Sequence, residues 1–322
     1  MIAPTFNWDN DRALYAEWGR YPEVGFHLGV PFDIYLSWDA MSNSAMKPLG
    51  RSPGHYQHSL LFPWEGSKQA DIGSASDLGW LESPALVPRQ FATPPVITPR
   101  KKNGEPYSNW LVSTPGKAWK ADMKEAGITV LSVDEAFQVF GIMLAMSQHE
   151  EAMELRRGAA TQVSIVWDHP VTVAPGEVMY VRCKGRFDIL GGMDGDPPYK
   201  PADMKTTTVV IDPLSDRDPF AKQAGILGYD RQAGHYCDGL TVLTGVPHTE
   251  FPLIVVEQAA PHPVAVYDID PGDIEAAQAE IDDLLLLYVD CKASGQWPCS
   301  VAPLPGEKHH KLHFQQWTRE VR

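Results

Sequence analysis

The sequence predicts an α/β fold in which a central mixed β-sheet is flanked by helices. Two kinds of segment lead to this prediction. Extended runs rich in β-branched and aromatic residues recur along the chain, at residues 162–167, 178–190, 202–211, 251–258 and 263–269. Segments with apolar residues at three- and four-residue spacing, which is typical of helices, lie around them at 133–157, 216–243 and 273–294.

Length and composition indicate a globular protein with a buried core. The chain has 322 residues, of which 43% are hydrophobic, enough for one large domain. The four cysteines are scattered and fit no zinc-binding spacing, so we expect reduced thiols and a cytoplasmic protein. No signal peptide is recognisable at the N-terminus, and the longest apolar run, residues 140–146, is too short to span a bilayer. We therefore expect no membrane partner.

The net charge of −14 argues against a protein whose open surface is coated for nucleic-acid binding. A nucleic acid would instead have to enter a local channel with a basic lining. Carboxylates that bind metal would also contribute to the acidic excess.

The elements of the N-terminal part follow from local signals. Residues 27–35 are predicted to be irregular or briefly extended, and residues 42–56 to form a short helix, a break at Ser52-Pro53 and a second helix. A further helix is expected at residues 72–84, where Pro84 ends it. Residues 85–120 contain several prolines and are predicted to be loop-like.

The later elements are more regular. Residues 133–157 are predicted to form one helix that Gly158 ends. Residues 216–243 are predicted to form a second long helix, and residues 273–294 to form the last. The turn at residues 194–198 lacks the spacing and the final glutamate of a calcium-binding loop.

The chemically informative residues are Asp188, Asp203 and Lys205. In a strand, residues two apart project from the same face, so Asp203 and Lys205 point into one space that Asp188 on a neighbouring strand could reach. Two carboxylates suit a hard cation such as Mg²⁺. A lysine beside them can orient or deprotonate a water and offset charge on a phosphate. The ordinary alternative is a surface ion pair.

This arrangement resembles the PD-(D/E)xK nuclease motif, and residues 182–188 and 203–207 resemble RecE-type exonucleases (exodeoxyribonuclease VIII-like). The resemblance implies a restriction-endonuclease-like core at residues 121–322, with residues 1–120 as an N-terminal wrapping segment of the same domain. It implies a metal-dependent DNA exonuclease that resects linear double-stranded DNA 5′→3′ for recombination by single-strand annealing. Mg²⁺ or Mn²⁺, a RecT-like annealing partner and a homo-oligomeric ring belong to the same expectation.

The resemblance also assigns roles to individual residues. Asp188, Asp203 and Lys205 would be catalytic, with the two aspartates and the backbone carbonyl of Met204 as metal ligands. Asp77 is a further candidate metal ligand, because it stands where the family has a histidine near the metal. Gln232 and Tyr236, which form a Q-x-x-x-Y element, and Arg186 are the candidates for substrate binding. Gln162, which replaces a glutamate, and Glu257 are candidates for supporting the metal ligands from behind.

Two alternatives stay open. Asp77 and Gln162 depart from the family pattern, which favours a catalytically degenerate protein that binds DNA ends or a recombination partner without cutting. The other alternative is a RecB-like nuclease with an iron–sulfur cluster. Such a protein would need a cysteine before the active-site strands, but the first cysteine of this sequence, Cys183, already lies within the strand at residues 178–190.

Overall fold

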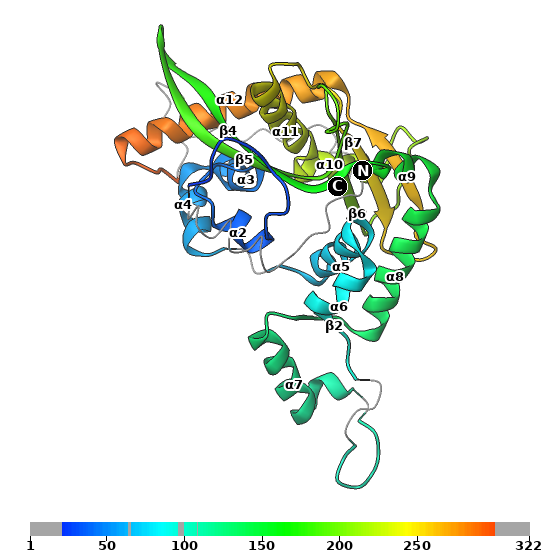
Figure 1. Cartoon of the computed structure of the whole chain (residues 1–322). Coiled ribbons are helices and arrows are strands. Elements are labelled where there is room, and N and C mark those ends of the chain that lie inside the picture. Colours follow the sequence, from blue (N-terminus) through cyan, green and yellow to red (C-terminus); the bar gives the residue numbers. More distant parts are fainter. Residues whose placement is uncertain (1–20, 64–65, 96–99, 108, 300–322) are drawn as a thin grey trace, which may run out of the picture.

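The computed structural model describes residues 21–63, 66–95, 100–107 and 109–299, shown in Figure 1. Its centre is a six-stranded sheet with the order β1-β4-β5-β6-β7-β8. The strands are β1 (Gly25–His27), β4 (Ala160–Ala174), β5 (Glu177–Gly191), β6 (Lys200–Thr207), β7 (Pro252–Glu257) and β8 (Val264–Asp268). The mixed sheet flanked by helices is therefore confirmed. The ends of the predicted wrapping segment and core, at residues 1–20 and 300–322, lie outside the described residues.

The sheet is mixed because one pair of neighbouring strands, β6 and β7, runs parallel while the other pairs are antiparallel. A parallel pair needs a crossover connection, which the helices α10 (Pro219–Leu227) and α11 (Tyr229–Thr244) provide. The prediction of one helix over residues 216–243 is wrong, because Gly228 adopts a left-handed conformation with φ of 71° and ends α10.

Helices cover both faces of the sheet. The side chains of β7 show this, because they alternate between two hydrophobic cores. Leu253 and Val255 contribute to one hydrophobic core, whereas Ile254 and Val256 contribute to the other. The first core lies under α3 (Asn43–Arg51), α4 (Pro53–Leu61), α11 and α12 (Pro271–Ser294). The second lies under α5 (Lys68–Asp77), α8 (Val133–Gln148) and α9 (Glu150–Arg156).

The N-terminal part is more helical than predicted. The break at Ser52 is confirmed, since its hydroxyl caps α4 by accepting a hydrogen bond from the His55 amide. Residues 27–35 do not stay irregular, because α2 (Phe32–Ser37) begins there. Residues 85–120 are not loop-like throughout, because α7 (Thr114–Glu125) starts behind a Ser113 cap with a proline in its first turn.

Shorter elements complete this part of the chain. They are the π-helix η1 (Leu78–Glu82), the 3₁₀ helices η2 (Pro84–Leu86) and η3 (Trp110–Val112), the helix α6 (Val87–Gln90), and the parallel pair β2 (Phe91–Ala92) and β3 (Thr129–Val130).

The region predicted as one helix over residues 133–157 consists of two helices. His149 lies in an extended conformation between α8 and α9 and caps the second by accepting from the Ala152 amide. Ser132 and Glu135 form a capping box at the start of α8. No described helix is both long and apolar enough to cross a membrane.

A histidine between two carboxylates ties β4 to α11 and α12. The His169 ring contacts Asp238 through Nδ1 at 2.8 Å and Asp282 through Nε2 at 2.9 Å. The indole of Trp167 also donates to Asp238. Burial lowers the pKa of His169, but the two carboxylates outweigh it and raise the pKa above its usual value.

We expect His169→Gln to lower the free energy of unfolding by about 1–2 kcal/mol at pH 5.5, because it removes a charged donor between two carboxylates. A raised histidine pKa stabilises the fold fully below the unfolded value of about 6.5, and this contribution is lost as pH rises through the folded pKa. Denaturant unfolding at pH 5.5 and 9 measures the difference, with the exposed His58→Gln as control. An equal loss at both pH values would contradict the assignment.

Candidate active site

The candidate site lies where β5 and β6 separate. The two strands pair at Ile189 and Ala202, and the same register would place Asp188 opposite Asp203, but the ladder ends there. Oδ2 of Asp188 instead accepts a hydrogen bond from the Met204 amide at 2.9 Å. The side chain of β5 thus replaces its backbone as the partner of β6, and both aspartates face the gap.

Asp203 is held from two sides. One carboxylate oxygen pairs with the ammonium group of Lys205, and the other accepts from the side-chain amide of Gln232 at 2.8 Å. The Lys205 ammonium also lies 4.8 Å from the ring centre of Tyr229 on α11. The structure therefore brings Asp203 and Lys205 together, as their spacing predicted, and places beside them Gln232, which the resemblance assigned to the site.

Gln162 lies between an acid and a base. Its amide nitrogen donates to Oδ1 of Asp188 at 3.3 Å, and its oxygen accepts from Nε of Arg186 at 2.8 Å. A carboxylate could accept from Arg186 but could not donate to Asp188, so the amide suits this position. Gln162 adopts a φ of 53° within β4, a strained conformation for a residue with a side chain, which is typical of functional sites.

Tyr236 closes the site from α11. Its ring packs edge-on against the ring of Phe187, with 4.9 Å between the two ring centres. A Cβ atom at Gly185 would lie 3.1 Å from the Tyr236 ring, so a glycine at this point of β5 allows the close approach. Tyr236 and Arg186 both line the same pocket as the two aspartates.

The pocket has a volume of about 390 Å³. Four carboxyl groups and two cationic groups line it, which leaves an excess of negative charge. The acids are Asp77, Glu82, Asp188 and Asp203, and the cations are Arg186 and Lys205. Glu82 was not predicted, although it lies in the segment predicted as a helix, because only the packing of η1 turns its carboxylate toward the pocket. The exposed apolar side chains of Phe32 and Leu36 on α2 also line it.

The positive charges of the pocket do not balance the charges of its carboxyl groups. Burial and the proximity of Asp203 raise the pKa of Asp188 to about 7. Burial, Asp188 and Asp203 likewise raise the pKa of Asp77, which places all three acids in one electrostatic environment. Burial alone would lower the pKa of Lys205, but Asp203 and Asp188 raise it. A further positive charge would relieve this repulsion.

A divalent cation fits this donor set. Mg²⁺ prefers oxygen ligands, keeps several of its waters and binds proteins through one or two carboxylates, which Asp188 and Asp203 supply. Among the described residues, no three histidine, cysteine or acidic side chains are grouped so that they could hold a metal together. The site is thus a pair of carboxylates rather than a closed cage. The roles of Asp77 and of the Met204 carbonyl remain predictions.

Glu257 does not support this pocket. Its carboxylate accepts a hydrogen bond from the Ile211 amide at 2.9 Å, in the segment after β6, and it is absent from the pocket lining formed by the described residues. The prediction that Glu257 supports the metal ligands is therefore not met. The residue fixes the path of the chain from β6 toward α10 instead.

The chain is similar to known proteins over most of its length. The sequence model of a family described as "PDDEXK-like domain of unknown function (DUF3799)" matches residues 42–302, which include Asp77, Asp188, Asp203 and Lys205 but not the part of the pocket that α2 forms. A crystal structure of a "putative exonuclease" from Eubacterium rectale is similar, with a TM-score of 0.47 and 15% identity over 78% of this chain and 82% of that one. No curated protein matches the sequence significantly.

We expect Asp188→Asn to stabilise the metal-free protein, raising Tm by about 1–3 °C at pH 8. The carboxyl group has a raised pKa, so its charged form opposes folding above pH 7, and the gain should vanish as pH falls toward 4. The amide oxygen can still accept from Met204. We also expect 10 mM Mg²⁺ to raise Tm of the wild type but not of the variant.

Thermal unfolding with and without Mg²⁺ measures both effects. Asp196→Asn, in the exposed turn between β5 and β6, is the matched control and should behave as the wild type. An Asp188→Asn protein that is less stable than the wild type at pH 8, or that keeps the full Mg²⁺ response, would contradict the assignment.

Proposed function

The chain belongs to the family of PDDEXK-like domains described as DUF3799, and we propose that it is a metal-dependent DNA nuclease. The observation that carries this proposal is the convergence of Asp188, Asp203 and Lys205 on one pocket at the point where β5 and β6 separate. Hydrolysis of a phosphodiester needs a site that binds a cation, orients a water and balances the charge that develops on the phosphate.

Each residue of the pocket has a task in this reaction. Asp188 and Asp203 hold Mg²⁺, which when bound polarises the phosphate and lowers the pKa of a water. The Lys205 ammonium, fixed by Asp203, donates to the attacking water or to a phosphate oxygen. Gln232 keeps the Asp203 carboxylate from rotating. Gln162 holds Arg186 at the pocket wall, where its guanidinium group can contact the DNA backbone.

We further propose that the substrate is the end of linear double-stranded DNA, cut exonucleolytically in the 5′→3′ direction to leave a 3′ strand for a RecT-like annealing partner. This part rests on the resemblance of residues 182–188 and 203–207 to RecE-type exonucleases. The net charge of −14 opposes binding along the open surface, so this proposal requires that the strand is captured locally, at the pocket that Arg186 and Lys205 line.

One observation favours a second candidate, a protein that binds DNA ends without cutting them. Both oxygens of Asp203 are already engaged, by Lys205 and by Gln232. Both oxygens of Asp188 also accept hydrogen bonds, from the Met204 amide and from Gln162. If these four donors do not yield to a metal, neither carboxylate is free to bind one. The pocket would then bind DNA through Arg186 and Lys205 alone.

We expect Lys205→Ala to lower the rate of Mg²⁺-dependent cleavage by about 10²-fold or more, because it removes the fixed donor that balances charge on the phosphate. Linear duplex labelled at the 5′ or the 3′ end measures the rate and the polarity together, with EDTA lanes as the metal control. Lys200→Ala, at the exposed start of the same strand, should retain full activity.

The outcomes separate the two candidates. Release of the 5′ label as single nucleotides from linear but not circular DNA would support the exonuclease. DNA that persists in every lane while its electrophoretic mobility is shifted would show binding without cutting. Cleavage of circular DNA would contradict the requirement for an end but not the nuclease itself.

A further inference from the structure

In the part of the chain that the structure describes, the outer edge of β5 has no neighbouring strand beyond the active site. On one side β5 pairs with β4 along most of its length, and on the other it pairs with β6 only at Ile189–Gly191. Met41 also meets this edge, since its amide donates to the Arg182 carbonyl and its carbonyl accepts from the Lys184 amide, both at 2.8 Å. From Arg182 back to Glu177, no described strand pairs with this edge.

The backbone direction follows from these bonds. The Arg182 carbonyl points away from β4, so the amide and carbonyl groups of Tyr180, two residues earlier, point the same way. Pro170 faces Tyr180 across the β4–β5 ladder. Having no N–H group, Pro170 protects the outer edge of β4, as prolines on edge strands do.

The edge of β5 has no such protection. Residues 178–181 are Val-Met-Tyr-Val, without proline or charge. The side chains of Val178, Met179 and Tyr180 are 47%, 46% and 68% exposed. An apolar open strand with free backbone donors and acceptors is a template for pairing with another strand. Figure 1 shows the β4–β5 hairpin extending from the body, where a second strand can reach it.

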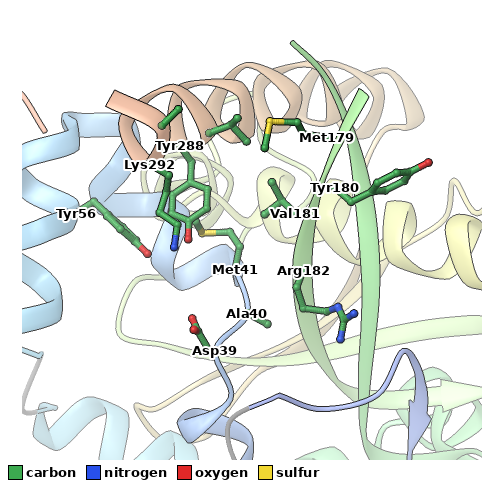
Figure 2. A pocket seen from close by; sticks show the side chains of 12 residues that line it. Asp39, Ala40, Met41, Tyr56, Met179, Tyr180, Val181, Arg182, Tyr288 and Lys292 are labelled. Carbon is green, nitrogen blue, oxygen red and sulfur yellow. The ribbon is translucent and has the colours of Figure 1, made fainter. Parts of the chain in front are cut away.

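A cavity of about 450 Å³ lies beside this edge, between α4, α12 and residues 39–41 (Figure 2). Aromatic contacts hold one wall of the cavity in place. The ring of Tyr56 stacks on that of Trp297, with 5.4 Å between the ring centres, and meets the ring of Tyr288 edge-on, with 5.8 Å between the centres. Figure 2 shows Met179 directed toward α12 and Tyr180 directed to the opposite side. A strand added to β5 would therefore send every second side chain toward the cavity.

We propose that two copies of this chain associate through the open edges of β5, which pair antiparallel about a twofold axis at Tyr180. In this register Tyr180 faces Tyr180 of the second copy, and Val181 faces the second copy's Met179. The latter side chain then lies on the cavity face, beside Met41 and Tyr288. One patch supplies the free backbone, the inserted side chain and the receiving cavity, which is the self-complementarity that a twofold interface requires.

The charges at this edge permit the contact. Each copy carries a net charge of −14, which opposes association in general. The cavity, however, is lined by one acidic side chain, Asp39, and two basic ones, Arg182 and Lys292. Arg182 is paired with Asp168 across the ladder. With Arg182 neutralised by Asp168, Asp39 and Lys292 leave the cavity without a net charge, so this edge is spared the repulsion between two acidic copies.

Sedimentation of the full chain across a concentration series tests the proposal. The wild type is expected at twice the chain mass of 35.7 kDa. Tyr180→Pro should raise the dimer Kd at least about tenfold, because it removes an outward N–H while sparing the β4–β5 ladder. Met179→Asp should do the same by placing a charge in the cavity. Phe137→Asp, at a 71% exposed position on α8, is the matched control and should leave the dimer intact.

A cross-link tests the register directly. Under mild oxidation, Tyr180→Cys in a Cys299→Ser background should form a disulfide-linked dimer, because the other cysteines are buried. Val112→Cys in the same background, on an exposed residue away from this edge, should not. A monomeric wild type, a mass of three or more copies as a ring would give, or a dimer that survives both folded edge variants would overturn the proposal. Circular dichroism establishes that each variant is folded.

Discussion

The hydrogen bond from the Met204 amide to the Asp188 carboxylate is the contact on which the site depends. It ends the β5–β6 ladder one residue before the two aspartates would face each other as ordinary strand neighbours. Because a side chain takes over from the backbone here, the strands separate and leave a pocket instead of a closed sheet. The parallel β6–β7 pair then fixes β6, and with it Asp203 and Lys205, from the other side.

The site is nevertheless costly to fold. Burial and the nearby Asp203 raise the pKa of Asp188, and the hydrogen bond from Met204, which lowers it, offsets only part of this effect. Gln162 adds a strained backbone conformation beside it. The rest of the structure offsets these costs with two continuous hydrophobic cores, one on each face of the sheet. Sites that concentrate uncompensated charge in this way are typically functional, since a fold selected for stability alone would replace them.

Local signals in the sequence predicted the strands well, and with them the meeting of Asp203, Lys205 and Asp188 in one pocket. The i, i+2 spacing of Asp203 and Lys205 requires only that a strand forms, and the i, i+4 spacing of Gln232 and Tyr236 requires only a helix. Errors arose where one residue interrupts a periodic pattern, as Gly228 and His149 do. Glu82 and Glu257 show the other limit, because the direction in which an acid faces depends on packing between segments far apart in the chain.

The central claim is that Asp188 and Asp203 together hold a divalent cation. Anomalous diffraction from crystals soaked in Mn²⁺ tests this most directly, since the metal itself gives the signal and no turnover is needed. The account predicts an anomalous peak between the two carboxylates, with Lys205 or Gln232 withdrawn from the Asp203 oxygen that binds the metal. A pocket without a peak at saturating Mn²⁺, or a peak bound only by other residues, would contradict it.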